Sequence, residues 1–391
     1  MAKYKLEDIC EFITDGTHQT PEYCDENGVI FLSSKDVTER KIDWDNVKYI
    51  PMNLHEQLYK RLKPQKNDIL LAKNGTTGVA AIVDRDEVFD VYVSLAVLRP
   101  KPDIYPKYLL YAINSPVAKR QFDSGLKGIG VPNLHLSVIR KTELNIAKRD
   151  EQENICLLLD KVSCLIDFRR QQLENLNNLI KARFVEMFGD PVINPYGLPM
   201  MTLGELSELI TKGASPSWQG FSYTDDNSQT LFVTSENVRE GYLDLSSPKY
   251  IEDGFNEKQK RSMIHKRDFL INIVGASIGR AAQFNLDCKA NMNQAAALVR
   301  VNDDRIRDKY LLIYLNSEKA QHMYNSMKSD TGRANLSLQD INDLSIMIPP
   351  VDKQIEYELF VEQVDKSKAV VQMALGEAQL LFDRLMKDYF G

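Results

Sequence analysis

Residues 151–191 read EQENICLLLDKVSCLIDFRRQQLENLNNLIKARFVEMFGDP. No glycine or proline interrupts this stretch before Gly189-Asp190-Pro191, and a glycine followed closely by a proline is a common end of a helix. We therefore predict a single helix from about Asp150 to Phe188. At 1.5 Å per residue, such a helix is roughly 55 Å long.

Apolar residues recur along this helix every seven positions, in two rows. The spacing places both rows on one side, so the helix carries an apolar seam and not a fully apolar surface. A seam on so long a helix needs a partner helix to cover it. The first row is Leu159, Ile166, Leu173, Ile180 and Met187, and the second is Ile155, Val162 and Leu176, interrupted by Arg169 and Arg183.

Residues 351–391 repeat this pattern in the same register and are the predicted partner. Adding 202 to a position in the first helix gives its counterpart, so that Val162 matches Val364 and Leu173 matches Leu375. Two unrelated amphipathic helices, each covering its own domain, are the alternative. The rows of the second helix are Tyr357, Val364, Val371, Ala378 and Leu385, and Val361, Lys368, Leu375, Phe382 and Tyr389. The residues predicted at the helix-pair interface are Leu159, Val162, Ile166, Leu173, Leu176, Ile180, Val364, Val371, Leu375, Phe382 and Leu385.

The repeat extends into the segments that precede the two helices. Residues 31–37 (FLSSKDV) match residues 232–238 (FVTSENV), and the glycine turn at 75–78 matches the turn at 275–279. Internal repetition of this kind is typical of a duplicated architecture. We predict four segments in the order domain, helix, domain, helix, with the bounds 1–149, 150–190, 191–350 and 351–391.

Each globular segment is predicted to mix strands and helices. In the first segment two strands flank the glycine turn, and a proline starts a helix. Strands are predicted at 69–72, 79–83, 91–98, 144–146 and 344–348, and a helix at 106–122. The fold class is therefore α+β, with two α/β domains and two long helices related by a pseudo-twofold tandem repeat.

The composition is that of an ordinary globular protein, with 43% hydrophobic and 27% charged residues, and no apolar run reaches the length of a membrane span. The cysteines show no metal-type spacing, which favours a reducing cytoplasm without structural disulfides or zinc. They are Cys10, Cys24, Cys156, Cys164 and Cys288. A net charge of −6 argues against a nonspecific coat on nucleic acid, but leaves DNA binding by local basic surfaces open.

No catalytic or metal site emerges from the sequence. Asn194-Pro195-Tyr196 lacks the second proline of the amino-methyltransferase motif, and no glycine-rich cofactor loop precedes it, so we interpret it as a turn. The turns at 75–78 and 275–279 lack the lysine and hydroxyl residue of a P-loop. No histidine has a cysteine or an acid at metal-ligand spacing. We expect no catalytic residue, metal or cofactor in this chain.

Basic residues precede the glycine turn in both halves, at 60–66 (KRLKPQK) and 258–267 (KQKRSMIHKR). A solvated charged face is one interpretation. Contact with DNA phosphates is the other, since lysine and arginine on the backbone position a protein and make its binding depend on salt. Both stay open at this point, because common ancestry alone would also preserve the repetition.

Two α+β domains that alternate with two long helices, the first ending Met187-Phe188-Gly189-Asp190-Pro191, resemble the specificity subunit of type I restriction-modification systems. The resemblance covers the whole chain. No single segment is specific, but their duplicated order is. The segments are 6–9 and 203–206 (LEDI, LGEL), 68–70 and 268–270 (DIL, DFL), 108–110 and 310–312 (both YLL), and 133–134 and 335–336 (both NL). The second helix departs from the first in ending at Phe390-Gly391, without the Asp-Pro.

The resemblance implies a protein without catalytic activity that binds a bipartite DNA sequence. Each globular domain would be a target recognition domain that reads one half of the target, and the helices, paired antiparallel, would set the spacing near one helical turn of DNA. Two methyltransferase subunits, which use S-adenosylmethionine on adenine, would dock on the helices. Motor-nuclease subunits driven by ATP with Mg²⁺ would join in some systems. The complex would serve in phage defence in the cytoplasm of a bacterium or archaeon.

The residues that contact DNA are predicted beside the basic stretches and the glycine turns. Family motifs do not transfer to them, because recognition domains differ most where they touch DNA. Arg99 and Arg300, at equivalent strand ends, are predicted to be structural. The candidates are Lys35, Arg61, Lys66, Lys73, Asn74, Thr76 and Thr77 in the first half, and Lys212, Trp218, Asn237, Arg261, Lys266, Arg267, Ser277 and Arg280 in the second.

Two other functions remain as alternatives. One is a methyltransferase or nuclease with unrecognised motifs, which binding of S-adenosylmethionine to the isolated chain would reveal. The missing cofactor loop and the symmetric duplication count against it. The other is a coiled-coil adaptor that holds proteins and no DNA, which sequence-dependent DNA binding by the partner complex would exclude.

Overall fold

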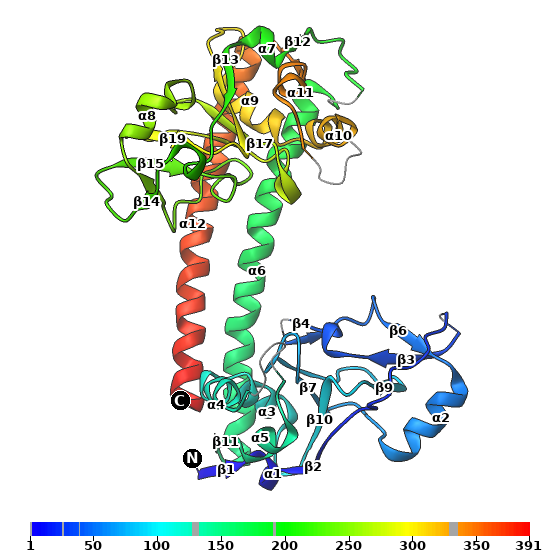
Figure 1. Cartoon of the computed structure of the whole chain (residues 1–391). Helices are drawn as coiled ribbons and strands as arrows, with labels where there is room; N and C mark the ends of the chain where they lie inside the picture. Colours follow the sequence, from blue (N-terminus) through cyan, green and yellow to red (C-terminus); the bar gives the residue numbers. More distant parts are fainter. Residues whose placement is uncertain (1, 26, 39, 127–132, 191–192, 328–334) are drawn as a thin grey trace. The chain divides into compact units, whose positions relative to one another are not determined.

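The computed structural model describes residues 2–25, 27–38, 40–126, 133–190, 193–327 and 335–391 (Figure 1). The chain folds into two compact units. The first consists of residues Met1–Leu173 and Val370–Gly391, and the second of residues Glu174–Ala369. Each unit therefore contains one globular domain and a section of each long helix. None of the described helices is both long and apolar enough to cross a membrane.

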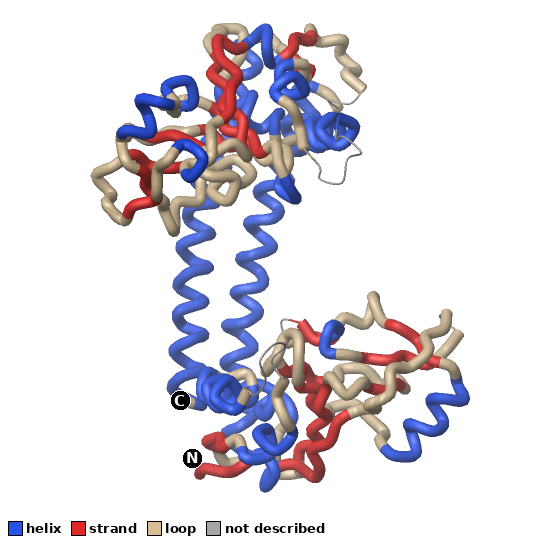
Figure 2. The backbone as a smooth tube through the Cα atoms, viewed as in Figure 1, coloured by secondary structure: helices blue, strands red, loops and turns tan. Residues whose placement is uncertain are grey.

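The long helices are α6 (Arg149–Phe188) and α12 (Val351–Phe390), drawn as the two longest blue tubes in Figure 2. Their ends keep the register of the sequence repeat. Gly189 has a φ of 79°, the left-handed conformation that ends a helix, while Pro191 lies outside the described residues. All the residues predicted at the helix-pair interface are buried or half-buried, as a seam requires.

The first domain is built on a four-stranded antiparallel sheet. Beside it lies a three-stranded sheet in which β3 and β9 run parallel. The first sheet has the order β2 (Cys10–Asp15), β10 (Leu95–Pro100), β7 (Ile69–Ala72), β8 (Ala80–Ile82), and the second β6 (Lys48–Ile50), β3 (Val29–Leu32), β9 (Phe89–Val91). Two further pairs are β1 (Ala2–Lys5) with β11 (Glu143–Ile146), and β4 (Val37–Thr38) with β5 (Lys41–Ile42). The helices are α1 (Leu6–Ile9), η1 (Ser34–Asp36), α2 (Met52–Arg61), α3 (Pro106–Ile113), α4 (Pro116–Gly125) and α5 (Leu136–Lys141).

The second domain repeats this plan. Its central sheet has the order β13 (Ser207–Lys212), β20 (Ala296–Val301), β17 (Phe269–Asn272), β18 (Ala281–Gln283). Its other sheet has the order β14 (Tyr223–Thr224), β16 (Tyr250–Ile251), β15 (Thr230–Val233), β19 (Ala290–Met292), and β12 (Met200–Thr202) pairs with β21 (Ser345–Met347). The helices are α7 (Leu203–Leu206), η2 (Ser217–Gln219), α8 (Gly254–Lys258), η3 (Lys260–Ser262), η4 (Gly275–Ser277), α9 (Asp308–Leu315), α10 (Glu318–Met327) and α11 (Leu338–Asn342).

The structure corrects two of the predicted elements. The single strand predicted at 91–98 is divided between β9 and β10, because the chain turns at residues 92–94. The single helix predicted at 106–122 is divided into α3 and α4. Ser115 caps α4 by accepting a hydrogen bond from the Ala118 N–H, and Pro116 has no N–H with which to continue α3.

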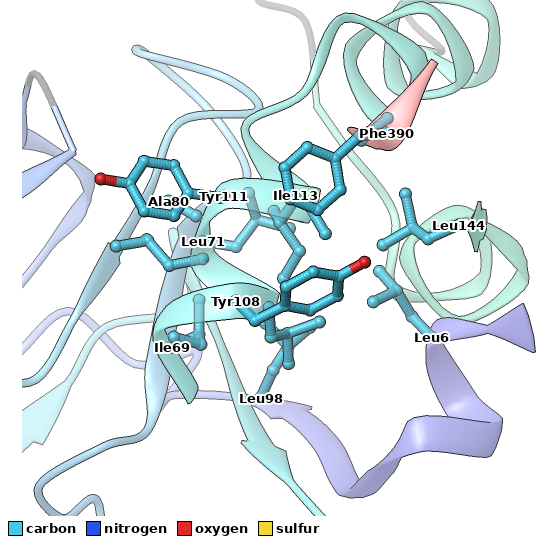
Figure 3. Packing of buried hydrophobic residues seen from close by; sticks show 14 of the residues in the cluster. Leu6, Ile69, Leu71, Ala80, Leu98, Tyr108, Tyr111, Ile113, Leu144 and Phe390 are labelled. Carbon is cyan, nitrogen blue, oxygen red and sulfur yellow. The ribbon is translucent and has the colours of Figure 1, made fainter. Parts of the chain in front are cut away.

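The core of the first unit joins the central sheet to α3, the start of α6 and the end of α12. Figure 3 shows Phe390 from α12 beside Tyr108 from α3, and their ring centroids are 5.1 Å apart. The Tyr111 hydroxyl donates to Asp160 of α6 at 2.6 Å, and the Tyr111 ring lies 6.3 Å from the ring of Phe382. Tyr111 therefore holds the beginning of one long helix and the end of the other, and Tyr108 adds a contact to the end of α12.

In the second unit the opposite ends of the helices share a core. Phe184 and Phe188 of α6 lie 5.7 and 5.4 Å from the ring of Tyr357 of α12. The Tyr357 hydroxyl donates to the carbonyl of Ile180 at 3.2 Å, and Arg183 pairs with Glu356 at 2.9 Å. Aromatic packing, with its large buried area, thus fixes these helix sections to each other.

One glutamine near the start of each long helix fixes that helix to its own domain. Gln152 accepts a hydrogen bond from the Tyr105 N–H at 2.7 Å and donates to the Ala147 carbonyl at 3.0 Å. Gln354, at the matching position, accepts from the Arg307 N–H at 2.7 Å and donates to the Pro349 carbonyl at 2.7 Å. Both are fully buried, which is tolerated because their polar groups are paired.

Candidate nucleic-acid interface

Loops of the first domain converge where β2, β3, β7 and β9 end. The Tyr92 N–H donates to the Leu32 carbonyl at 2.8 Å, and the Lys73 N–H donates to the Ser94 carbonyl at 2.8 Å. The Leu134 N–H donates to the Lys73 carbonyl at 2.8 Å. These bonds define the first loop cluster, which comprises residues 15–18, 33–36, 73–78, 92–94 and 133–134.

Most of the DNA-contact candidates of the first half meet in this cluster. Lys35, Asn74, Thr76, Thr77 and Lys73 belong to its loops, and Arg61 reaches it from α2 through hydrogen bonds to the carbonyls of Asp15 and Gly16. Lys66 does not join them, because its ammonium group pairs with Asp86 at 2.9 Å.

Several of these candidates hold the loops together and are not free to contact a ligand. Lys73 is buried, with its ammonium 2.5 Å from the carboxylate of Asp15. The Thr76 hydroxyl lies 3.2 Å from the carbonyls of Ser34 and Val37. The predicted role of Lys73 in DNA contact is therefore corrected to a structural one, because a buried, paired ammonium cannot reach a phosphate. Among the described residues, the side chains of Lys35 and Thr77 form no such contact.

The second loop cluster comprises residues 212–215, 234–238, 273–280, 293–295 and 335–336. It is held by the bonds from the Asn293 N–H to the Val233 carbonyl at 3.1 Å and from the Leu336 N–H to the Ile273 carbonyl at 2.9 Å. The candidates Lys212, Asn237, Ser277 and Arg280 lie in it. Asn237 is structural, since it is buried, accepts from the Thr234 N–H at 2.8 Å and donates to the Asp244 carbonyl at 2.9 Å.

The remaining candidates of the second half lie outside this cluster. Trp218, in η2, is 89% exposed, which excludes a core role for it. Arg261 is exposed as well. Lys266 pairs with Asp287 at 2.7 Å, and Arg267 makes two hydrogen bonds to Asp308 at 2.7 and 2.9 Å. Partners within the domain thus occupy much of the basic stretch that was predicted to contact phosphate.

The arginines predicted to be structural are so. Arg99 makes two hydrogen bonds of 2.8 Å to the buried carboxylate of Asp68, and Arg300 repeats this with Asp268 at 2.8 and 2.7 Å. The hydrogen bond to each carboxylate raises the pKa of its arginine. The pairs join β7 to β10 and β17 to β20 at the ends opposite the glycine turns.

The described residues contain all five cysteines of the chain, each as a free thiol. No group of three or more His, Cys, Asp or Glu side chains there is arranged to hold a metal ion. Burial raises the pKa of Cys10 and of Cys156 to about 12, so neither thiol is an activated nucleophile.

The Asp15–Lys73 pair gives a test of the first loop cluster. The second domain has Lys212 and Ile273 at these positions. Lys73→Ile alone removes the nearest cation of the buried Asp15 and leaves it beside the exposed imidazole of His18, whose Nε2 lies 3.6 Å away. We expect this variant to lose about 3 kcal/mol of folding stability. The double variant Asp15→Lys, Lys73→Ile is expected to recover most of the loss, as measured by denaturant unfolding.

Lys66→Gln is the control, because the exposed pair with Asp86 is worth less than about 1 kcal/mol. A double variant as unstable as Lys73→Ile would show that the two residues do not act as a pair.

Comparison with known proteins agrees with this architecture. Residues 1–178 and 197–372 match the family model described as the type I restriction modification DNA specificity domain. The EcoBI specificity subunit of Escherichia coli is 27% identical over 68% of this chain and 62% of that protein, so the match spans less than two thirds of this relative. The EcoKI specificity subunit of Escherichia coli is 20% identical over 97% of this chain and 85% of that protein.

Solved structures share the fold. A chain from a study of complex assembly and conformational transition of the type I R-M system has a TM-score of 0.59, at 16% identity and with 99% of this chain and 97% of that chain covered. The S subunit of a type I restriction-modification system from M. genitalium has a TM-score of 0.54, at 14% identity and with 100% and 96% covered. Because the family model matches both halves of the sequence, this chain belongs to the type I restriction modification DNA specificity domain family.

Proposed function

We propose that this chain is the DNA sequence-specificity subunit of a type I restriction-modification enzyme and performs no chemical step itself. The observation that carries the proposal is the duplication of a whole domain, with a loop cluster in each copy and a long helix after each. A bipartite DNA target has two separate half-sites, and two such domains provide one reader for each half. Membership of the DNA specificity family favours this function over a DNA-free adaptor and over an enzyme.

In this proposal residues 1–149 and 191–350 are target recognition domains, and residues 150–190 and 351–391 are spacer helices that pair as an antiparallel coiled coil. The composition of the two cores supports the antiparallel sense. The start of α6 shares a core with the end of α12 in the first unit, and the end of α6 shares a core with the start of α12 in the second. A rigid helix pair then fixes the distance between the half-sites.

The proposed partners are two methyltransferase subunits that dock on the long helices. A second set of apolar residues, distinct from the seam, recurs on each helix at a spacing of 11, which is about three turns and returns to the same face. These residues are 47–68% exposed, and exposed apolar rows of this kind mark interaction surfaces. They are Leu157, Phe168 and Leu179 on α6, and Leu359, Val370 and Leu381 on α12. Equal rows on the two helices suit two copies of one partner.

Cofactors belong to the partners in this proposal. S-adenosylmethionine serves the methyltransferase subunits, and ATP with Mg²⁺ serves motor-nuclease subunits where these join the complex. In this proposal the chain binds chromosomal and phage DNA, and the complex works in the cytoplasm of its cell.

The length of the helices is expected to set the gap between the half-sites. Four residues inserted after Leu173 in α6 and after Ala369 in α12, where the chain passes from one unit to the other, lengthen each helix by about 6 Å. This distance is roughly two base-pair steps. The methylated motif is therefore expected to gain one or two base pairs of gap while its half-sites stay the same.

The gap is read from sequencing of methylated adenine in cells that express the variant with its methyltransferase. The control is the same insertion after Gly241, an exposed turn of the second domain, which should leave the gap unchanged. An unchanged gap in the helix variant would contradict the spacer role.

The exposed apolar rows are expected to bind the methyltransferase subunits. Phe168→Asp and Val370→Asp each remove an apolar contact that docking would bury, worth about 2 kcal/mol. The affinity for the methyltransferase subunits, measured by titration calorimetry, should therefore fall at least tenfold. Asn178→Asp, at an exposed polar position of α6, is the control. Association as tight as that of the unchanged protein in both Asp variants would rule out these rows as the docking surface.

A further inference from the structure

The edge strand β6 of the first domain borders an open depression of about 660 Å³. Its lining includes Tyr23, Asp25, Asn27, Lys48 and Tyr49. The loop that carries Tyr23 is attached to β6 by the bond from the Cys24 N–H to the Tyr49 carbonyl at 3.0 Å. This depression is separate from the loop cluster described above, and none of these residues was a candidate from the sequence.

A tyrosine ring and a lysine ammonium are stacked on each other in this depression. Lys48 Nζ lies 4.2 Å from the centroid of the Tyr23 ring, close enough for a cation–π interaction. The Tyr23 ring in turn stands edge-on to the buried ring of Phe31, with 6.3 Å between centroids. Among the described residues no carboxylate forms an ion pair with Lys48, so its charge is oriented by the ring and open to a ligand.

The second domain contains the same side chains at the matching positions. Tyr223 stands edge-on to Phe232 at 5.7 Å, and Lys249 Nζ lies 5.9 Å from the Tyr223 ring centroid. Strand β14, which carries Tyr223, pairs with β16 as the Cys24 loop pairs with β6. The repeated side chains are Tyr23 and Tyr223, Asp25 and Asp225, Asn27 and Asn227, Lys48 and Lys249, and Tyr49 and Tyr250.

Packing does not account for this repetition. Tyr23 is 46% and Tyr223 53% exposed, and both lysines are exposed. Turn formation accounts for the Asp and Asn residues, since the Gly28 N–H bonds to the Asp25 carbonyl at 3.1 Å and such residues favour turns. It does not require a lysine stacked on a tyrosine. The tyrosine–lysine pair therefore calls for a ligand that is common to both domains.

The tyrosine–lysine pair is the same in both halves, whereas the two loop clusters differ from each other. Matching residues there have unrelated chemistry, as expected for surfaces that read different base sequences. The differing pairs are Lys35 and Glu236, Asn74 and Val274, and Thr76 and Ala276. Each domain thus combines a variable surface with a constant one.

We propose that the tyrosine–lysine pair of each domain contacts the sugar–phosphate backbone of DNA, in the same way in both halves, while the loop clusters read the bases. This inference rests on the proposed function and adds a division of labour to it. The backbone is the one part of DNA that does not change between two different half-sites. The ammonium group binds a phosphate, and the ring beneath it orients the ammonium and covers the adjoining sugar.

In the second domain a carboxylate competes with phosphate for the lysine of the pair. Lys249 lies 3.0 Å from Glu236, and both groups are exposed, so the ion pair is weak and opens when a phosphate competes. The first domain has Lys35 in place of Glu236. The backbone contact of the first domain is therefore the stronger of the two.

The test uses the complex of this chain with its methyltransferase subunits and two duplexes, one with the methylated bipartite motif and one with that motif scrambled. Binding is measured by fluorescence anisotropy over a range of salt concentrations. Lys48→Gln and Lys249→Gln should each weaken binding roughly three- to tenfold and lower the salt slope by about one. For a given variant, the factor should be the same for the motif duplex and for the scrambled duplex. The Lys48→Gln effect should be the larger, and Lys48→Arg should retain binding.

Lys63→Gln is the matched control. Lys63 also lies over a tyrosine ring, 5.5 Å from the centroid of Tyr59, but the second half has Met263 in its place. Its substitution should leave the affinity and the salt slope unchanged. Equal thermal unfolding of all variants shows that they are folded.

Several results would overturn the inference. One is an unchanged salt slope in Lys48→Gln and Lys249→Gln while the unchanged protein still prefers the motif. Another is weakening confined to the motif duplex, which would mean base reading. A third is loss of the methyltransferase subunits, which would mean a protein-binding surface. If the unchanged complex shows no preference for the motif, the proposed function fails first and this inference falls with it.

Discussion

Burial of the apolar seam of two 40-residue helices is the interaction on which the rest of the structure depends. A helix of this length with one apolar side is not stable alone in water, because that side must be removed from solvent. Tyr111 and Tyr357 show how this is done. Tyr111 of the first domain contacts both long helices, and Tyr357 of α12 packs on Phe184 and Phe188 of α6, which in turn contact Tyr310 of the second domain. Domain folding and helix pairing are thereby coupled within each unit.

The two domains make side-chain contacts at matching places, but the residue types that make them are not always the same. Arg99 with Asp68 and Arg300 with Asp268 are the same ion pair. In contrast, the contact between α2 and β9 in the first domain and the matching contact between α8 and β19 in the second are made by different groups. His55 and Asp90 meet at 2.7 Å in the first, and Asn256 and Asn291 meet at 2.8 Å in the second. Burial raises the pKa of Asp90, whereas the amide pair does not titrate.

The sequence was sufficient for the mixed α+β class and for the two long helices, because periodicity and repetition are properties of the chain itself. It was also sufficient for the structural role of Arg99, which sits at the same strand end as Arg300. It failed for Lys73, because only the fold brings Asp15 next to it. It missed Tyr23 and Lys48, which are 25 positions apart and meet only through the pairing of the Cys24 loop with β6. Gln152 and Gln354 were missed although their repetition at the start of both helices was visible.

The most direct test of the central claim is a genome-wide map of N6-methyladenine in cells that co-express this chain with its methyltransferase subunit, compared with the same cells lacking this chain. The account predicts a new bipartite motif, with two short half-sites separated by a fixed gap, that depends on this chain. An unchanged map, with both proteins soluble and associated, would contradict DNA reading by the two domains and would favour the adaptor function.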